Sequence, residues 1–151
     1  MELWTVLPAA AESARVARRM LKDWLGTLCW PDDEAIDIVL AVNEALSNVV
    51  DHAYPPATPG QAHLYAWEAI DPGQRDRRII AVVTDSGRWK PAAATDPGSS
   101  RGRGLPMMAG CMDSVHIEPT PQGTTVIMTS RPATVSAENV AALPPQAEDA
   151  G

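Results

Sequence analysis

Apolar residues recur along the first part of the chain at the spacing of a helix. Between residues 14 and 28 they appear at three- and four-residue steps, which predicts an amphipathic helix. The opposite face of this helix carries four basic residues, Arg15, Arg18, Arg19 and Lys22. This arrangement is typical of a solvated helix face, and the alternative is a contact surface for an acidic partner.

A second helix is predicted over about residues 33–53. The segment Pro31-Asp32-Asp33-Glu34 is typical of a helix start, because it offers a capping Asp and places acids in the first turn. Residues 36–50 are apolar on nearly every side, as expected of a buried helix.

Polar residues interrupt this second helix on one face. Glu44 and Asn48 are four residues apart and therefore share that face, which Asp37, Asp51 and His52 extend. An unpaired buried polar group costs about 1–3 kcal/mol, so these side chains need partners. The pattern indicates either an internal hydrogen-bond network or a site at which a ligand supplies the partners.

Strands are predicted in most of the remaining chain, separated by turns rich in Pro and Gly. The apolar run within residues 77–84 indicates a strand that is buried on both faces. Residues 86–104 form a long loop, which in a compact domain is usually functional or disordered. The predicted strands are 3–7, 62–70, 77–84, 114–118 and 124–130, and a further short helix is predicted over 105–112.

The composition predicts one small acidic domain. The chain has 151 residues, 45% of them hydrophobic, which is enough for a single core, assigned to residues 1–131. Residues 132–151 are rich in Ala, Pro and acids and carry too little apolar surface to order themselves, so they are expected to form a flexible tail. A net charge of −7 argues against direct nucleic-acid binding, which requires a basic surface.

The sequence gives no sign of membrane insertion or export. No apolar run is long enough to cross a bilayer, and the N-terminus lacks the basic region of a signal peptide. Cys29 and Cys111 are far apart and form no CxxC pair, so neither a zinc site nor a disulfide scaffold is expected. We therefore expect a cytoplasmic protein without membrane contact.

Three short motifs follow the second helix in order. Asp85 closes an apolar strand two residues before Gly87, although both residue types are also common in plain turns. Arg101-Gly102-Arg103-Gly104 leads into the short helix, where glycines admit an anion and the helix N-terminus favours negative charge. Gly123-Thr124-Thr125 opens the last strand. Each motif alone is a weak signal.

The order of these motifs resembles that of the Bergerat-fold (GHKL) ATPases over about residues 3–131. Within that superfamily, residues 41–48 (AVNEALSN) and 102–108 (GRGLPMM) are most similar to the anti-sigma factor serine-protein kinases. The resemblance implies an α+β fold, a two-layer sandwich with a mixed, mostly antiparallel sheet of about five strands, covered on one face by three helices. It also implies an ATP lid over about residues 86–103.

The resemblance also implies roles for individual residues. Glu44 would be the general base on the attacking hydroxyl, and Asn48 would ligate Mg²⁺ through its amide oxygen. The carboxylate of Asp85 would accept a hydrogen bond from the exocyclic amine of adenine. The implied nucleotide-binding residues are Asn48, His52, Asp85, Gly87, Arg101, Gly102, Arg103, Gly104, Leu105 and Thr125.

One position departs from the family's D-x-G-x-G pattern, because Trp89 stands where the second glycine is expected. Tryptophan does not replace glycine where the backbone needs a positive φ, although its ring could cover the adenine edge or pack beneath the lid. The departure concerns the geometry of the lid more than recognition of the base.

The resemblance implies an ATP-dependent serine/threonine kinase that also acts on transcription. Such proteins hold an RNA polymerase sigma factor inactive and phosphorylate a STAS-domain anti-sigma factor antagonist, and they often form homodimers. The alternative is a nucleotide-binding interaction module of the same fold without kinase activity. Glu44 favours the kinase, because ATP binding alone needs no base, whereas Trp89 favours the alternative.

Overall fold

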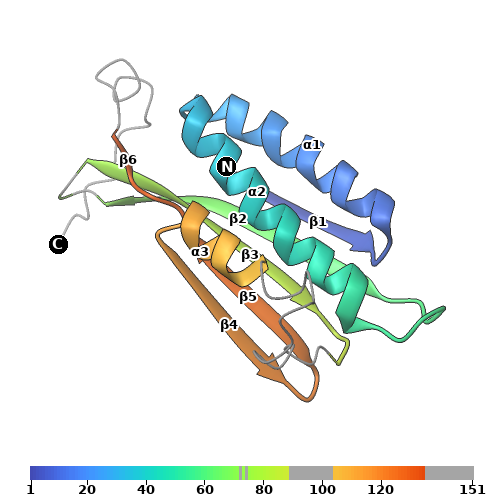
Figure 1. Ribbon diagram of the computed structural model, residues 1–151. Helices are drawn as coiled ribbons and strands as arrows, with labels where there is room; N and C mark the ends of the chain where they lie inside the picture. Colours follow the sequence, from blue (N-terminus) through green and yellow to red (C-terminus); the bar gives the residue numbers. More distant parts are fainter. Residues whose placement is uncertain (72, 74, 89–103, 135–151) are drawn as a thin grey trace, which may run out of the picture.

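The computed structural model describes residues 1–71, 73, 75–88 and 104–134, which form a two-layer α+β fold (Figure 1). The elements in chain order are β1 (Glu2–Pro8), α1 (Ala11–Thr27), α2 (Asp32–Asn48), the π-helical turn η1 (Val49–Ala53), β2 (Gln61–Asp71), β3 (Asp76–Asp85), α3 (Gly104–Cys111), β4 (Ser114–Thr120), β5 (Gly123–Thr129) and β6 (Ala133–Thr134). None of the helices described is both long and apolar enough to span a membrane.

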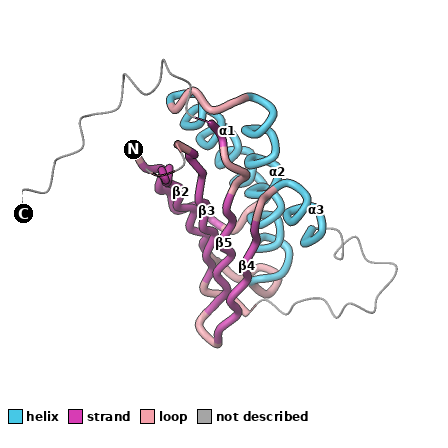
Figure 2. Tube along the Cα trace, turned by 90° about the vertical axis from the view of Figure 1, so that its left-hand side faces the viewer, coloured by secondary structure: helices cyan, strands magenta, loops and turns pink. Residues whose placement is uncertain are grey.

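The sheet has the strand order β1-β2-β3-β5-β4, and β6 pairs with the first residues of β3. Every pairing in the described residues is antiparallel. Helices α1, α2 and α3 lie on one face of the sheet, as the two views show (Figures 1 and 2). The predicted sandwich of a mostly antiparallel sheet under three helices is thereby confirmed.

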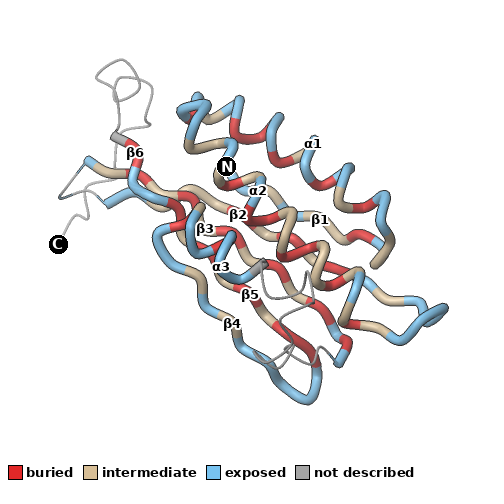
Figure 3. The backbone as a smooth tube through the Cα atoms, viewed as in Figure 1, coloured by how far each residue is buried: buried red, intermediate tan, exposed pale blue. Residues whose placement is uncertain are grey.

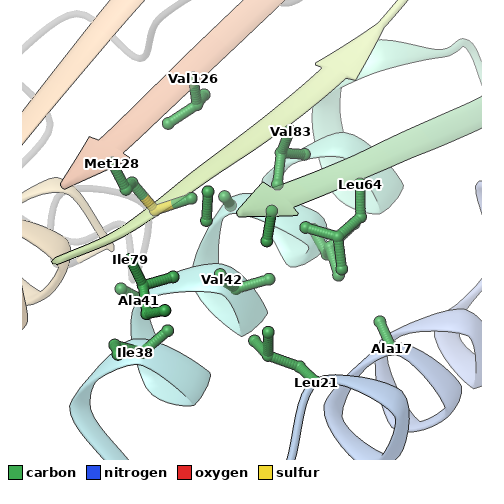
Figure 4. Close-up of a cluster of buried hydrophobic side chains, with 14 of the residues drawn as sticks. Ala17, Leu21, Ile38, Ala41, Val42, Leu64, Ile79, Val83, Val126 and Met128 are labelled. Atoms are coloured by element: carbon green, nitrogen blue, oxygen red, sulfur yellow. The ribbon is translucent and has the colours of Figure 1, made fainter. Parts of the chain in front are cut away.

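The core lies between the helices and the covered face of the sheet (Figures 3 and 4). Leu21 of α1 and Val42 of α2 pack towards Leu64 of β2, Val83 of β3 and Met128 of β5. Each of these side chains is at most 1% exposed. The close packing of these aliphatic groups fixes the helices on the sheet and so fixes where the polar residues of α2 lie.

Strand β3 corrects one prediction. Its apolar run indicated burial on both faces, but burial alternates strictly along the strand. Ile79, Ala81 and Val83 are buried under the helices, whereas Ile80 and Val82 are half-buried on the other face. The reason is that this sheet has helices on one face alone, so the second set of apolar side chains lacks a covering layer.

The second helix follows its prediction up to Asn48 and then changes geometry. Regular α-helix ends at Asn48, and Val49–Ala53 form a π-helical turn. A π turn holds more residues than an α turn, so side chains after Asn48 rotate relative to the α-helical pattern. The four-residue spacing from Asn48 to His52 therefore does not place them on one straight line along the helix.

Strand β6 was absent from the sequence prediction, which began the tail at residue 132. Ala133 pairs with Arg77 at the start of β3. The Arg77 side chain, itself buried, donates hydrogen bonds to the carbonyl oxygens of Leu28 and Cys29 at 2.9 and 3.0 Å. The last described residues are thus attached to the sheet close to the segment that joins α1 to α2.

Candidate functional site

Asp85 is the last residue of β3 and points towards the helical layer. The residue is 9% exposed, and its Oδ1 accepts a hydrogen bond from the backbone N–H of Gly87 at 2.9 Å. Burial raises the pKa of the Asp85 carboxyl, and the backbone N–H groups of Gly87 and Thr124 oppose that shift. The carboxylate is therefore held in one orientation in a partly desolvated place, as recognition of a specific donor requires.

Gly87 lies directly against the end of the helical segment. The N–H of Arg88 donates to the carbonyl oxygen of Ala53 at 2.7 Å. A β-carbon at position 87 would lie 2.0 Å from that same oxygen. Glycine is required here because two backbones meet, and this contact fixes Asp85 relative to η1.

The start of β5 packs equally closely on the other side of Asp85. Gly123 has a φ of +144°, and a β-carbon there would lie 1.9 Å from the carbonyl oxygen of Asp85. The next residue, Thr124, is 3% exposed. Backbone contact at this position brings the Gly-Thr-Thr motif to the carboxylate, although the two are far apart in sequence.

The two threonines of this motif point to opposite faces of the sheet. Thr125 pairs with Thr84, and both are half-buried on the face without helices. Thr124 is buried on the covered face, as Asp85 is, and its N–H contacts the Asp85 carboxylate. The structure therefore places Thr124 beside Asp85, whereas the resemblance implied Thr125. The two-residue alternation of strands puts these two threonines on opposite faces.

A pocket of about 420 Å³ opens beside Gly87. It is lined by η1 residues that include His52, by the segment from Ala53 to Pro55, and by Ser86, Gly87 and Arg88. The hydroxyl of Tyr54 accepts a hydrogen bond from the N–H of Ser86 at 3.1 Å. The structure thus brings His52 and Gly87 together, and it adds Tyr54, for which the sequence offered no signal.

Glu44 and Asn48 lie one turn apart on α2 and are both half-buried. No hydrogen bond or ion pair joins either side chain to another of the residues that the structure describes. Asp37, by contrast, forms an ion pair with Arg131 at 3.2 Å. The polar stripe of α2 therefore divides into Asp37, which is paired, and Glu44 and Asn48, whose side chains form no hydrogen bond to another described residue.

Helix α3 packs against α2, the helix that carries these polar residues. Burial raises the pKa of the Cys111 thiol, and the nearby carboxylates of Asp37 and Glu44 raise it further, while Arg131 opposes them. Helices α2 and α3 pack against each other, and Glu44 lies on α2. Gly104 begins α3, and Leu105 is 41% exposed. Arg101, Gly102, Arg103 and Trp89, with most of the predicted lid, lie outside the described residues.

The protein side chains described do not form a metal cage by themselves. No group of three His, Cys, Asp or Glu side chains in the described ranges comes close enough to hold a metal ion. Mg²⁺ commonly binds through one or two protein oxygens and completes its shell with phosphates and waters. A half-buried amide such as that of Asn48, without a hydrogen-bond partner among the described residues, is chemically suited to that mode of binding.

Known proteins share sequence similarity with this chain over most of its length. Residues 7–130 match the model of the histidine kinase-like ATPase domain. The serine-protein kinase RsbW of Bacillus subtilis is 29% identical over 136 residues, covering 82% of this chain and 81% of that protein. RsbW of Bacillus velezensis is 27% identical over 136 residues, with the same coverage of both chains.

A solved structure shows the same fold. The crystal structure of the RsbU and RsbW domains of a Mycobacterium tuberculosis protein matches 90% of this chain with a TM-score of 0.63 and 23% identity. The match covers 35% of that longer chain. Because the family model extends over most of the sequence and the fold agrees, this chain belongs to the histidine kinase-like ATPase domain family.

Proposed function

We propose that this chain binds ATP with Mg²⁺ and acts as an anti-sigma regulatory factor with serine/threonine protein kinase activity. It would hold a sigma factor of RNA polymerase inactive and phosphorylate a STAS-domain antagonist of that inhibition in the cytoplasm. Membership of the ATPase family supports the binding of ATP. Similarity to the Bacillus serine-protein kinases supports a protein serine or threonine as the phosphate acceptor. The observation that carries the proposal is the buried Asp85 carboxylate beside Gly87, close to the end of the helical segment that bears Glu44 and Asn48.

Asp85 is the residue we assign to the adenine base. Its fixed carboxylate would accept a hydrogen bond from the exocyclic amine, a group that guanine does not present at the same position. Thr124, on the same face of the sheet, would complete the contacts to the base. A buried site built to pair with one donor rejects a ligand that lacks it, because the carboxylate would remain unpaired.

Asn48 and Glu44 are the residues we assign to the phosphate end. Mg²⁺, when bound, neutralises phosphate charge, which is the main requirement of phosphoryl transfer. Asn48 would offer its amide oxygen to the ion. Glu44, one turn earlier, would take the proton of the acceptor serine or threonine hydroxyl. The oxygen of that hydroxyl would form a bond to the γ-phosphorus while the bond between the γ-phosphorus and ADP breaks. His52, Gly104, Leu105 and the segment Arg101–Arg103 are proposed as further phosphate contacts.

Transfer of labelled phosphate tests this proposal. A pull-down from cells with and without ATP, analysed by mass spectrometry, identifies the STAS-domain and sigma-factor partners. The purified chain is then incubated with γ-labelled ATP, Mg²⁺ and the STAS protein. We expect label on a serine or threonine of that protein, and none when this residue is replaced by alanine.

The other outcomes separate the competing interpretations. ATP binding without transfer to any captured STAS protein would favour a nucleotide-binding interaction module. Absence of ATP binding at millimolar concentration in calorimetry would reject both nucleotide proposals. A homodimer remains a further expectation, which sedimentation of the purified chain measures directly.

A further inference from the structure

A groove of about 580 Å³ runs along the outer side of the helical layer, away from Asp85. We call it the helix groove. It is lined by one face of α1 from Arg18 to Gly26, by Trp30, and by α2 from Asp32 to Leu40. None of the residues assigned to the nucleotide lines this groove.

The helix groove combines apolar surface with a basic wall. Ile36 and Leu40 are 57% and 42% exposed, which is unusual for large apolar side chains on one side of a helix. Arg18 and Lys22 of α1 line the same groove. Neither forms any of the ion pairs found among the described residues. The chain as a whole has a charge of −7, so this basic wall contrasts with the rest of the molecule.

The last described residues lie at one end of this groove. Ala133 of β6 pairs with Arg77, whose guanidinium binds the carbonyl oxygens of Leu28 and Cys29. The same guanidinium lies 4.7 Å from the centroid of the Trp30 ring, and Trp30 lines the groove. Figure 1 shows β6 at the end of the molecule where α1 finishes and α2 begins. The described part of the chain, which ends at residue 134, therefore finishes beside the groove.

We propose that residues 135–151 of the same chain dock in the helix groove. This segment contains three acidic residues, Glu138, Glu148 and Asp149, and no basic one, so its charge is complementary to the wall of α1. It also contains the apolar residues Val140 and Leu143. A segment with too little apolar surface to form its own core can still bury those residues against a surface that already exists.

The order of residues along the segment matches the order along the groove. Starting from β6, the apolar part at 140–143 precedes the acidic pair at 148–149. Starting from Trp30, the exposed apolar side chain of Ile36 comes before that of Leu40 along α2, and on α1 Lys22 comes before Arg18. The eight-residue step from Gly26 to Arg18 spans about 12 Å of helix, and nine extended residues reach about 30 Å. The segment is thus long enough for its acids to meet Lys22.

The floor of the groove offers one further contact. Trp30 is 4% exposed, and its indole N–H has no acceptor among the residues that the structure describes. Trp30 lines the groove, but this N–H is itself buried, so the docked segment would pack against other atoms of the residue. Docking would also leave the nucleotide residues uncovered, since the groove lies on the outer side of α1 and α2.

Zero-length cross-linking of the unmodified chain of 151 residues tests the proposal. A carbodiimide joins an amine to a carboxylate in direct contact, and the sequence contains two lysines, Lys22 and Lys90. We expect mass spectrometry to find Lys22 linked to Glu148 or Asp149 within one chain. The yield should fall to background in 1 M salt, where the Debye length is about 3 Å. A Lys22 that forms no link to these acids would overturn the proposal.

Variants and isotope mixing exclude the other occupants. The double change Ile36→Glu and Leu40→Glu should abolish the cross-link, whereas Met107→Glu, an exposed apolar position on α3, should leave it unchanged. Mixing ¹⁵N-labelled and unlabelled chains distinguishes the source of the acid. Mixed-isotope products would assign the groove to a second copy of the chain and overturn docking in cis. Links from Lys22 to a captured partner protein alone would overturn it as well.

Discussion

Gly87 and Ala53 are in backbone contact, and this contact joins the end of β3 to the end of the helical segment. The carbonyl oxygen of Ala53 accepts the N–H of Arg88 at 2.7 Å, in a space where a β-carbon on residue 87 would be 2.0 Å from the oxygen. Asp85, two residues earlier, is positioned by the same contact. The candidate base-binding carboxylate therefore depends on a residue that has no side chain.

Replacement of Gly87 by alanine should destabilise the fold and displace Asp85. Overpacking of this kind typically costs about 1–3 kcal/mol, because the neighbouring backbone must move. Urea unfolding measures the loss. The control is Gly110→Ala in α3, where a β-carbon meets nothing within 4 Å and should stabilise the helix by up to about 1 kcal/mol. Equal stability of the two variants would contradict the steric role of Gly87.

The exchange Asp85→Asn should weaken ATP binding and change nucleotide preference. An amide in place of the carboxylate mispairs with the adenine amine, at a cost of about 1–3 kcal/mol. Calorimetric titration with ATP and GTP measures both effects. Asp113→Asn, at an exposed ion pair with Arg78, is the control and should bind ATP as the wild type does. An unchanged ATP/GTP ratio in Asp85→Asn would count against our assignment of Asp85.

The raised pKa of Asp85 predicts a pH-dependent stability difference. The folded state holds this proton more tightly than the unfolded chain, whose aspartate pKa is about 3.9. Wild-type stability therefore falls as pH rises from that value through the raised pKa of the folded state. The variant Asp85→Asn has no carboxyl group at this position to titrate, so its free energy of unfolding does not fall for this reason. The free energy of unfolding of the variant minus that of the wild type should therefore increase over this pH range and stay constant above it. Urea unfolding of both nucleotide-free proteins from pH 4 to 7 measures this difference. A difference in free energy of unfolding that does not change with pH would contradict the raised pKa of Asp85.

Glu44→Gln should separate ATP binding from phosphate transfer. Loss of a general base lowers transfer by about 10²–10⁴-fold, whereas a neutral isostere leaves the nucleotide contacts intact. Single-turnover transfer to the STAS partner and calorimetric ATP titration give the two quantities. Glu118→Gln on exposed β4 serves as the control, and transfer there should be unchanged. Parallel loss of binding and transfer in Glu44→Gln would reject the role of a base.

Arg77→Met should destabilise the attachment of β6 and of the α1–α2 connection. The change removes two hydrogen bonds to carbonyl oxygens and leaves Glu68, 3.1 Å away and with 17% of its side chain exposed, without its cation. Breaking a buried ion pair from one side costs about 3–5 kcal/mol, and the partial exposure of Glu68 favours the lower end. Thermal unfolding measures the loss. Arg78→Met, which breaks an exposed pair with Asp113, should cost at most about 1 kcal/mol.

The fold was predictable because its signals are local. The three-and-four spacing of apolar residues around Leu21 and Leu25 predicted α1, and both residues are at most 1% exposed. The alternation in β3 was hidden, however, because Ile80 and Val82 are apolar although they lie on the uncovered face. Strand β6 was missed because two residues give no periodicity.

The sequence by itself determined the order of motifs, and with it the family and the candidate polar residues Glu44, Asn48 and Asp85. Tertiary structure decided which polar side chains of α2 already have partners. Arg131 forms an ion pair with Asp37, whereas no described residue pairs with Glu44. It also decided that Thr124 shares a face with Asp85, and that Gly87 meets Ala53. The reason is physical: helix and strand periods depend on neighbours in sequence, whereas partners, clashes and desolvation depend on contacts between residues that only the packed chain brings together.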